Sequence, residues 1–230
     1  MGSRVNLFRH ARVVSKTRLR RDGGRPRHLT ERAWRVAWIP AFAGMTVALA
    51  CCGSEAALAH TGLEHAVSFA SGFKHPWTGL DHMLAMVAVG LWAGLNGGRA
   101  LWAWPVAFVG VMVAGGALGM ADVPIPMVEP GILASVIVLG LLVLAAAQLP
   151  VITGAALVAV FAALHGHAHG AELPTQAAAA SYAAGFALAT ALLHGIGLGV
   201  AYLARSETGR LLVRGTGAAV AVAGVALAVT

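Results

Sequence analysis

The stretch His75-Pro-Trp-Thr-Gly-Leu-Asp81-His82-Met-Leu-Ala-Met-Val-Ala-Val-Gly-Leu-Trp-Ala93 places two histidines and an aspartate at the start of an otherwise apolar helix. We predict that Pro76 is the first residue of this helix, a position that proline favours. His75 and His82 then lie two turns apart on nearly the same face, with Asp81 beside them. Polar side chains at the edge of a membrane-buried helix usually face a polar pathway inside the bundle. A divalent cation is the simplest single reason for three of them.

The composition is that of a membrane protein. Hydrophobic residues make up 58% and charged residues 11% of the 230 positions, and the mean hydropathy is +0.77. Soluble domains carry about 25% charged residues. We therefore predict an all-α polytopic membrane protein, a bundle of about six transmembrane helices after an N-terminal signal or leader segment. The predicted spans are Leu80–Leu95, Ala100–Met120, Gly131–Leu149, Val151–Leu164, Gln176–Ala204 and Leu211–Thr230.

Two of these spans are short. A hydrocarbon core of about 30 Å needs about 20 helical residues, and Leu80–Leu95 and Val151–Leu164 fall below that length. Each adjoins a histidine-rich segment. We expect these histidine-rich ends to lie at the membrane edge or in a polar cavity, as parts of a site rather than of the lipid-facing surface.

Residues 1–59 are predicted to form a basic extension with a signal-like apolar segment, and residues 60–230 to form the six-helix membrane domain. Eleven of the sixteen Lys and Arg residues fall in the first 35 positions, so the net charge of +7 describes the extension. A basic tail before an apolar run is typical of an export signal rather than of nucleic-acid binding. Met45 is an alternative start. Ala57-Leu58-Ala59 resembles a signal-peptidase site, so we expect cleavage near Ala59; an uncleaved first helix is the alternative.

Charges in the predicted loops indicate an orientation. If the segment that starts at His60 lies outside, four of the five basic residues after position 59 fall in inner loops, with Lys74 as the exception. This is the positive-inside pattern. It predicts a multi-pass membrane protein with the segment from His60 on the outer side. The inner basic residues are Arg99, Arg205, Arg210 and Arg214.

A second polar cluster, His165-Gly-His167-Ala-His169-Gly-Ala-Glu172, follows the fourth span. His165 and His169 share a face if the segment is helical, and the glycines permit a turn that directs all three histidines inward. Because successive spans alternate in direction, we expect this cluster and the first one at the same membrane face. Neutral imidazole and carboxylate suit nickel, cobalt, zinc or copper(II). The candidate metal residues are His75, Asp81, His82, Glu129, His165, His167, His169, Glu172 and His194.

His194 differs from the other histidines because it lies deep in the fifth span. About 18 residues, or about 27 Å of helix, separate it from the start of that span. It is either an inner relay ligand or a structural histidine that bonds to a neighbouring helix. We predict that the adjacent Gly195, Gly197 and Gly199 do more than allow close helix packing.

Two kinds of chemistry are excluded from the bundle. Cys51 and Cys52 are the only cysteines and precede the first span, so neither a disulfide framework nor thiolate ligation is available there. The chain has no G-x-x-x-x-G-K-[ST] loop, so it does not itself use ATP. We expect no prosthetic group. The expected partners are a divalent metal ion and the lipid bilayer but no nucleic acid, and association into a homo-oligomer stays open.

The motifs resemble those of a known family. His-Pro-x-x-Gly-x-Asp-His from His75, followed by Leu-Ala-Met-x-Ala-Val-Gly-Leu-Trp, looks like the first signature of the HupE/UreJ nickel permeases. The cluster from His165 to Glu172 is similar to the second signature, and Pro126-x-x-Glu129-x-Gly131-Ile132 and His194-Gly195 also look like that family. The resemblance covers about residues 60–230; the long Arg-rich amino terminus departs from the family's short signal peptide. The metal residues that it implies are His75, Asp81, His82, Glu129, His165 and His169.

By that resemblance the chain is not an enzyme but a multi-pass permease of the bacterial inner membrane, with the segment that starts at His60 in the periplasm. It would take up Ni²⁺ or Co²⁺ as transported substrate and be linked indirectly to hydrogenase or urease maturation proteins. A membrane-embedded zinc hydrolase is the first alternative, although catalytic zinc needs three ligands and one open position and this chain offers more donors at two depths. A periplasm-facing metal sensor or chaperone is the second alternative, and it would not need His194.

Overall fold

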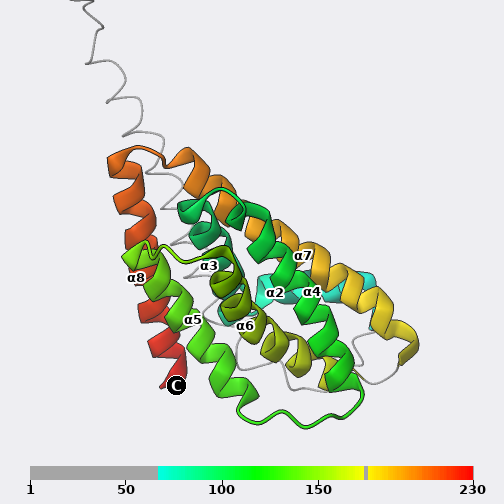
Figure 1. Cartoon of the computed structure of the whole chain (residues 1–230). Coiled ribbons are helices and arrows are strands. Elements are labelled where there is room, and N and C mark those ends of the chain that lie inside the picture. The colour runs from blue at the N-terminus through cyan, green and yellow to red at the C-terminus, as the bar shows by residue number, and fades with distance from the viewer. Residues whose placement is uncertain (1–66, 174–175, 230) are drawn as a thin grey trace, which may run out of the picture. The chain divides into compact units, whose positions relative to one another are not determined.

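The computed structural model describes residues 67–173 and 176–229, and within these ranges all regular secondary structure is α-helical (Figure 1). The predicted leader of residues 1–59 lies outside the described residues. The helices are α2 (Phe69–Thr78), α3 (Leu80–Asn96), α4 (Ala100–Met120), α5 (Val128–Ala145), α6 (Val151–Ala171), α7 (Gln176–Leu203) and α8 (Glu207–Ala228).

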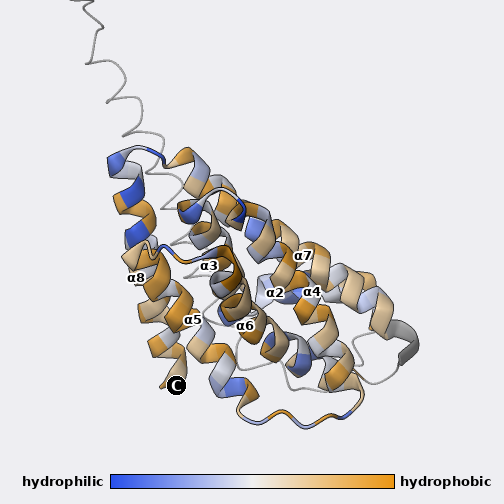
Figure 2. Cartoon of the chain, in the orientation of Figure 1, coloured by the Kyte–Doolittle hydropathy of each residue, from blue (hydrophilic) through white to orange (hydrophobic). Residues whose placement is uncertain are grey.

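The prediction of an all-α membrane bundle is confirmed. Helices α4 to α8 are each long and apolar enough to cross a bilayer, and α2 with α3 forms a bent pair that makes up to six spans among the described residues. Hydrophobic residues run along the helices, whereas hydrophilic ones gather where α8 begins and in the neighbouring connections (Figure 2). With no water in the hydrocarbon core, only structures that satisfy their own backbone hydrogen bonds can span it, and helices do so. The chain is therefore a multi-pass membrane protein.

The prediction for the start of the first helix is wrong. Pro76 does not begin a helix but lies within α2, and α3 starts four residues later, after a bend of 83°. Helix α2 begins at Phe69, and the side chains of its N-cap Ser68 and of Ser71 form a capping box, a start signal that precedes the apolar run. Gly79 takes an extended backbone conformation and separates the two helices.

The predicted bounds of the fourth span are also wrong. Helix α6 does not stop at Leu164 but continues to Ala171, and with 21 residues it is long enough to span the membrane. No turn interrupts the histidine-rich segment, because its backbone stays helical through the glycines. The third span begins at Val128 and ends at Ala145, and the last begins at Glu207 after its N-cap Ser206.

Glycines allow the helices to approach closely. A Cβ atom on Gly166 of α6 would overlap the carbonyl of Met112 in α4, and one on Gly90 of α3 would overlap the carbonyl of His194 in α7. Small residues at helix contacts are what permits such approach in membranes. The interpretation of the glycines beside His194 is not supported: Gly197 packs against α3, whereas Gly195 and Gly199 have nothing within 4 Å.

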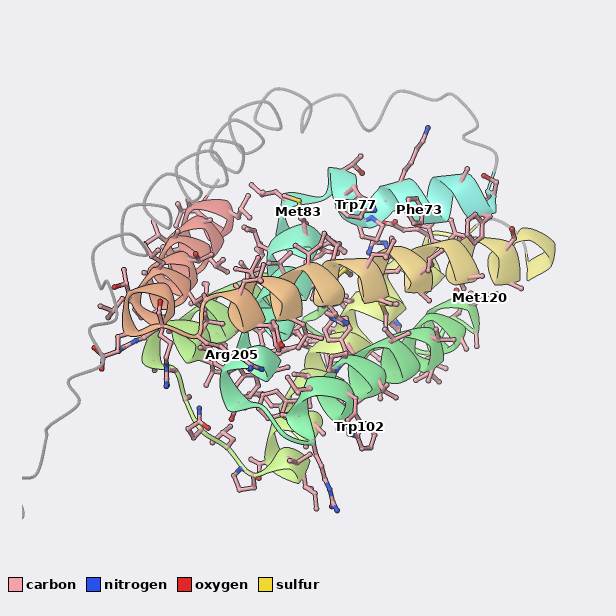
Figure 3. All side chains as sticks on the ribbon, turned by 90° about the horizontal axis from the view of Figure 1, so that it is seen from above. Phe73, Trp77, Met83, Trp102, Met120 and Arg205 are labelled. Atoms are coloured by element: carbon pink, nitrogen blue, oxygen red, sulfur yellow. The ribbon has the colours of Figure 1, made fainter. Side chains whose placement is uncertain are left out.

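The bundle has two chemically different ends. Helices α2 and α3 meet at one end, where Gly79 lies beside Asp81 and His82. The opposite end carries the α3–α4 and α7–α8 connections with their arginines. Arg205 stacks on the ring of Tyr202 there, and Figure 3 places it at the far end of α7 from Phe73.

Candidate metal centre

The bend between α2 and α3 brings two histidines together. His75 lies in the last turn of α2 and His82 in the first turn of α3. Their ring centroids are 5.7 Å apart. The two rings therefore approach each other across the corner at Gly79, not along one straight helix as the sequence suggests.

Helix α6 supplies two more imidazoles to the same place. His165 and His169 are one turn apart, so they share a face, and they are 0% and 9% exposed. The His169 ring lies 4.4 Å from that of His75 and 4.6 Å from that of His82, and the His165 ring lies 5.0 Å from that of His82, measured between centroids.

Three ring nitrogens converge on one point. One nitrogen from each of His75, His82 and His169 lies within 4.8 Å of the others. The Nε2 atoms of His82 and His169 face each other at 2.5 Å. Imidazole nitrogen binds borderline divalent metals such as Zn²⁺, Ni²⁺ and Cu²⁺, so the cluster has both the geometry and the donor type of a metal site. We call His75, His82 and His169 the three-histidine site.

Asp81 orients one of these ligands. Its Oδ1 accepts the backbone N–H of His82 at 2.8 Å and lies 2.7 Å from Nδ1 of the same ring. A carboxylate only accepts hydrogen bonds, so Nδ1 of His82 carries a proton and Nε2 presents its lone pair to the site. Carboxylate–histidine pairs of this kind are the usual means of fixing a metal-binding imidazole.

His165 is held in the same way by the backbone. Its Nδ1 lies 2.8 Å from the carbonyl of Phe161, to which it donates a hydrogen bond. Its Nε2 is buried without a hydrogen-bond partner. Buried polar atoms normally have partners, and an unpaired imidazole nitrogen on a ring that lies 5.0 Å from that of His82 is an available fourth ligand.

Glu172 stands at the exposed edge of the site. It caps α6, its side chain is 71% exposed, and its Oε2 lies 3.8 Å from Nδ1 of His169. The interaction with the His169 ring lowers the pKa of the Glu172 carboxyl. The carboxyl is therefore ionised at neutral pH and adds negative charge where a cation would arrive.

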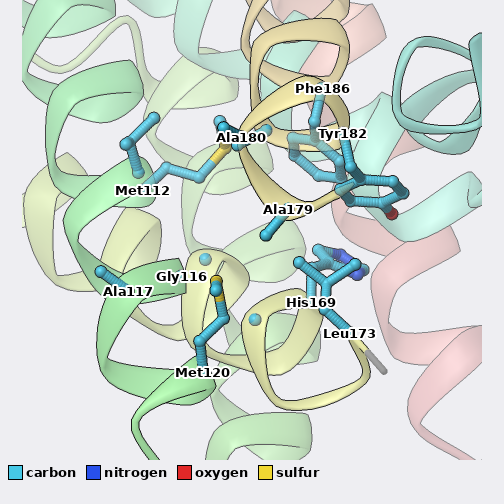
Figure 4. Close-up of a pocket in the computed structure, with 14 residues that line it drawn as sticks. Met112, Gly116, Ala117, Met120, His169, Leu173, Ala179, Ala180, Tyr182 and Phe186 are labelled. Atoms are coloured by element: carbon cyan, nitrogen blue, oxygen red, sulfur yellow. The ribbon is translucent and has the colours of Figure 1, made fainter. Parts of the chain in front are cut away.

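Helix α7 contributes aromatic walls that the sequence analysis missed. Phe186 lies 4.8 Å from the His169 ring and 5.8 Å from the His75 ring, and Tyr182 lies 6.3 Å from the His75 ring. The i, i+4 spacing of the two aromatic residues was the available signal, but it is as typical of ordinary packing. A cavity of about 360 Å³ adjoins His169, and Figure 4 shows Met112 of α4 across it.

Two predicted site residues lie elsewhere. The prediction that all three histidines of the second cluster point inward is wrong for His167, because the continuous helix turns it to the side of the α4–α5 loop, where its Nε2 donates to the carbonyl of Val123 at 2.7 Å. Glu129 lies exposed in the first turn of α5. Among the described residues, no interaction joins Glu129 to the histidines of the site.

His194 lies deeper, apart from the three-histidine site. It is 1% exposed, and neither ring nitrogen has a hydrogen-bond partner. The ring of Phe108 on α4 lies close to both His194 and His165: its centroid is 5.1 Å from that of the His194 ring and 5.7 Å from that of the His165 ring. A structural histidine would form a hydrogen bond to a neighbouring helix, and His194 forms none. The geometry therefore favours a histidine whose ring nitrogens are available as metal ligands at this depth.

Comparison with known proteins agrees with the motifs. The family model described as "HupE / UreJ protein" matches residues 47–227. Protein HupE of Rhizobium leguminosarum bv. viciae is 49% identical over 171 residues, which cover 74% of this chain and 89% of that protein. No solved structure shows a significant match. With nearly the whole membrane bundle matched, the chain belongs to the HupE/UreJ family.

Proposed function

We propose that this protein is a secondary permease that takes up Ni²⁺, or Co²⁺, across the bacterial inner membrane and so supplies the assembly of hydrogenase or urease metallocentres. The observation that carries the proposal is the convergence of His75, His82 and His169 at one end of a membrane bundle. Membership of the HupE/UreJ family supports it. We propose transport rather than catalysis because donors occur at two depths in the bundle.

The donor set suits the proposed substrate. Imidazole and carboxylate, without thiolate, favour divalent first-row metals over soft Cu(I). The affinity of such ligands for divalent metals rises from Mn²⁺ to Cu²⁺ in any protein, so affinity by itself does not select nickel or cobalt. Selection for nickel or cobalt therefore rests on the spacing and number of the nitrogens, in which His165 serves as the additional ligand.

We propose that the three-histidine site faces the periplasm. Among the described residues the arginines lie at the opposite end of the bundle: Arg99 before α4, Arg205 between α7 and α8, and Arg210 and Arg214 near the start of α8. Basic connections stay on the cytoplasmic side. In this orientation Glu172 and the cavity beside His169 form the entrance from the periplasm.

The proposed path leads from the three-histidine site past His165 and Phe108 to His194. A cation that loses water on entry gains nitrogen ligands at the three-histidine site. His194 offers fewer ligands, so it binds the cation more weakly and allows it to leave again. The membrane potential favours inward movement of a dication by about 4.6 kcal/mol at 100 mV, at about 2.3 kcal/mol per charge.

Replacing His194 by alanine tests transport against surface binding. We expect nickel binding to the purified protein to stay at the wild-type level, because the three-histidine site is intact, while accumulation of radioactive nickel in cells falls strongly. Accumulation at the wild-type level would contradict a path through His194. If the wild-type protein binds nickel but never accumulates it, the permease proposal itself is wrong and a sensor or chaperone replaces it.

His167 and His169 form a matched pair on one helix. We expect His167→Ala to leave nickel uptake close to wild type, because this ring bonds to the loop at Val123. His169→Ala removes a nitrogen of the three-histidine site and should abolish saturable uptake. The measurement is the initial rate of nickel uptake against concentration, at matched protein levels. Equal loss in both variants would contradict the assignment of these two side chains.

A further inference from the structure

Two buried tryptophans pack against each other, with their rings tilted by 32°, at the end of the bundle opposite the three-histidine site. Trp92 of α3 and Trp104 of α4 are both 0% exposed, and their ring centroids are 4.1 Å apart. Helix α6 packs closely against Trp104, because a Cβ atom on Gly154 would overlap the Trp104 ring. Three helices thus converge on one pair of indoles, which we call the indole pair.

Both indoles are hydrogen-bonded to backbone near the start of α6: Trp92 to Ala147, between α5 and α6, and Trp104 to Val151, the first residue of α6. Nε1 of Trp92 donates to the carbonyl of Ala147 at 2.8 Å, and Nε1 of Trp104 donates to that of Val151 at 2.9 Å. Their only polar atoms are therefore satisfied by backbone. The rest of both ring surfaces is apolar.

Asn96 fastens the same segment to α3. Its Nδ2 donates to the carbonyl of Ala147 at 3.0 Å, and its Oδ1 accepts the backbone N–H of Leu149 at 3.2 Å. Asn96 lies four residues, about one turn, beyond Trp92. The indole pair and the α5–α6 connection (residues 146–150) are thus held as one unit.

The indole pair lies on the line of the proposed path. On α4, Trp104 is one turn closer to the basic end than Phe108, and Phe108 contacts both His165 and His194. On α3, Trp92 lies two residues closer to the basic end than Gly90, which packs against the backbone of His194, and its ring meets that of Trp104. The indole pair therefore lies next to the Phe108–His194 contact, on the side of the basic end.

We propose that the indole pair, held by the α5–α6 connection, is the inner gate of the metal path and that it is closed in this structure. This inference rests on the proposed transport function. An apolar constriction excludes water and ions, so the site at the other end stays open to one side only. Opening requires the connection to move away, and Asn96 opposes that movement.

The test is leakage of protons into liposomes that contain the purified protein, with no transported metal present. A pH-sensitive dye inside the vesicles reports the rate. We expect Asn96→Ala and Trp92→Ala each to raise this leak on the order of tenfold, because each removes hydrogen bonds that hold the connection. Nickel binding at the three-histidine site should stay unchanged in both.

Trp102→Ala is the matched control, since Trp102 is on the same helix as Trp104 but 61% exposed. Its leak should equal that of the wild type. Wild-type leak in both test variants, or an equally raised leak in Trp102→Ala, would overturn the gate. If Trp92→Ala fails to insert, Asn96→Ala decides alone, because it leaves the indoles in place. Failure of the transport proposal would appear separately, as a wild type that does not take up nickel.

Discussion

His82→Ala is expected to abolish saturable nickel uptake while the protein still inserts into the membrane. The Nε2 of His82 faces that of His169, and Asp81 fixes its orientation. Loss of an outer-shell partner costs about 10–100-fold in metal affinity, so loss of the ligand itself should cost more than about 100-fold. Nickel binding by the purified protein, measured by calorimetry, and uptake by cells should fall together.

The control for His82→Ala is His167→Ala, which also removes an imidazole ring, but at a position that faces the α4–α5 loop. Amounts of both variants in the membrane fraction must match the wild type for the comparison to count. Residual binding within tenfold of the wild type would mean that the three-histidine site does not need His82. The proposed coordination would then be wrong.

Gly166→Ala is expected to prevent normal packing of α6 on α4. The added methyl group would overlap the backbone carbonyl of Met112, and backbone cannot swing aside as a side chain can. Overpacking typically costs about 1–3 kcal/mol of folding free energy, and a rigid backbone contact such as this one should lie near about 3 kcal/mol. For a chain of this size we expect a fall in Tm of roughly 6–12 °C.

This packing defect should also reach the site. Gly166 is adjacent to His165 and within one turn of His169, so displacement of α6 moves two imidazoles away from His82. Thermal unfolding in detergent and nickel binding should both be impaired. Gly110→Ala on α4 is the matched control, because nothing lies within 4 Å of that position and alanine is the better helix former. Equal Tm values for the two variants would contradict the argument.

Much of the architecture could be predicted because its causes are local. A charged fraction of 11% and long apolar runs suffice to indicate membrane helices. The bounds of α4 follow from the same reasoning and match the structure. The predicted end of α6 was too early because glycine and histidine have low helix propensities in water. In lipid, however, a helix is the way for this segment to satisfy its backbone hydrogen bonds.

The residues of the candidate site could be named from sequence, but their arrangement could not. His75, Asp81 and His82 stand together in the chain, and alternation of the spans puts His165 and His169 at the same end. Whether a side chain points into the bundle depends on the rotation of its helix. That rotation is decided by which glycines contact which backbone, as Gly166 does with Met112.

The sequence alone thus determined the fold class and the pool of nitrogen and oxygen donors, because hydropathy and residue chemistry belong to each residue by itself. The tertiary structure alone decided that His167 and Glu129 stand apart, that the chain bends by 83° at Gly79, and that Trp92 meets Trp104. These features depend on how whole helices lie against one another. They follow from close packing of whole helices, which no single stretch of sequence specifies.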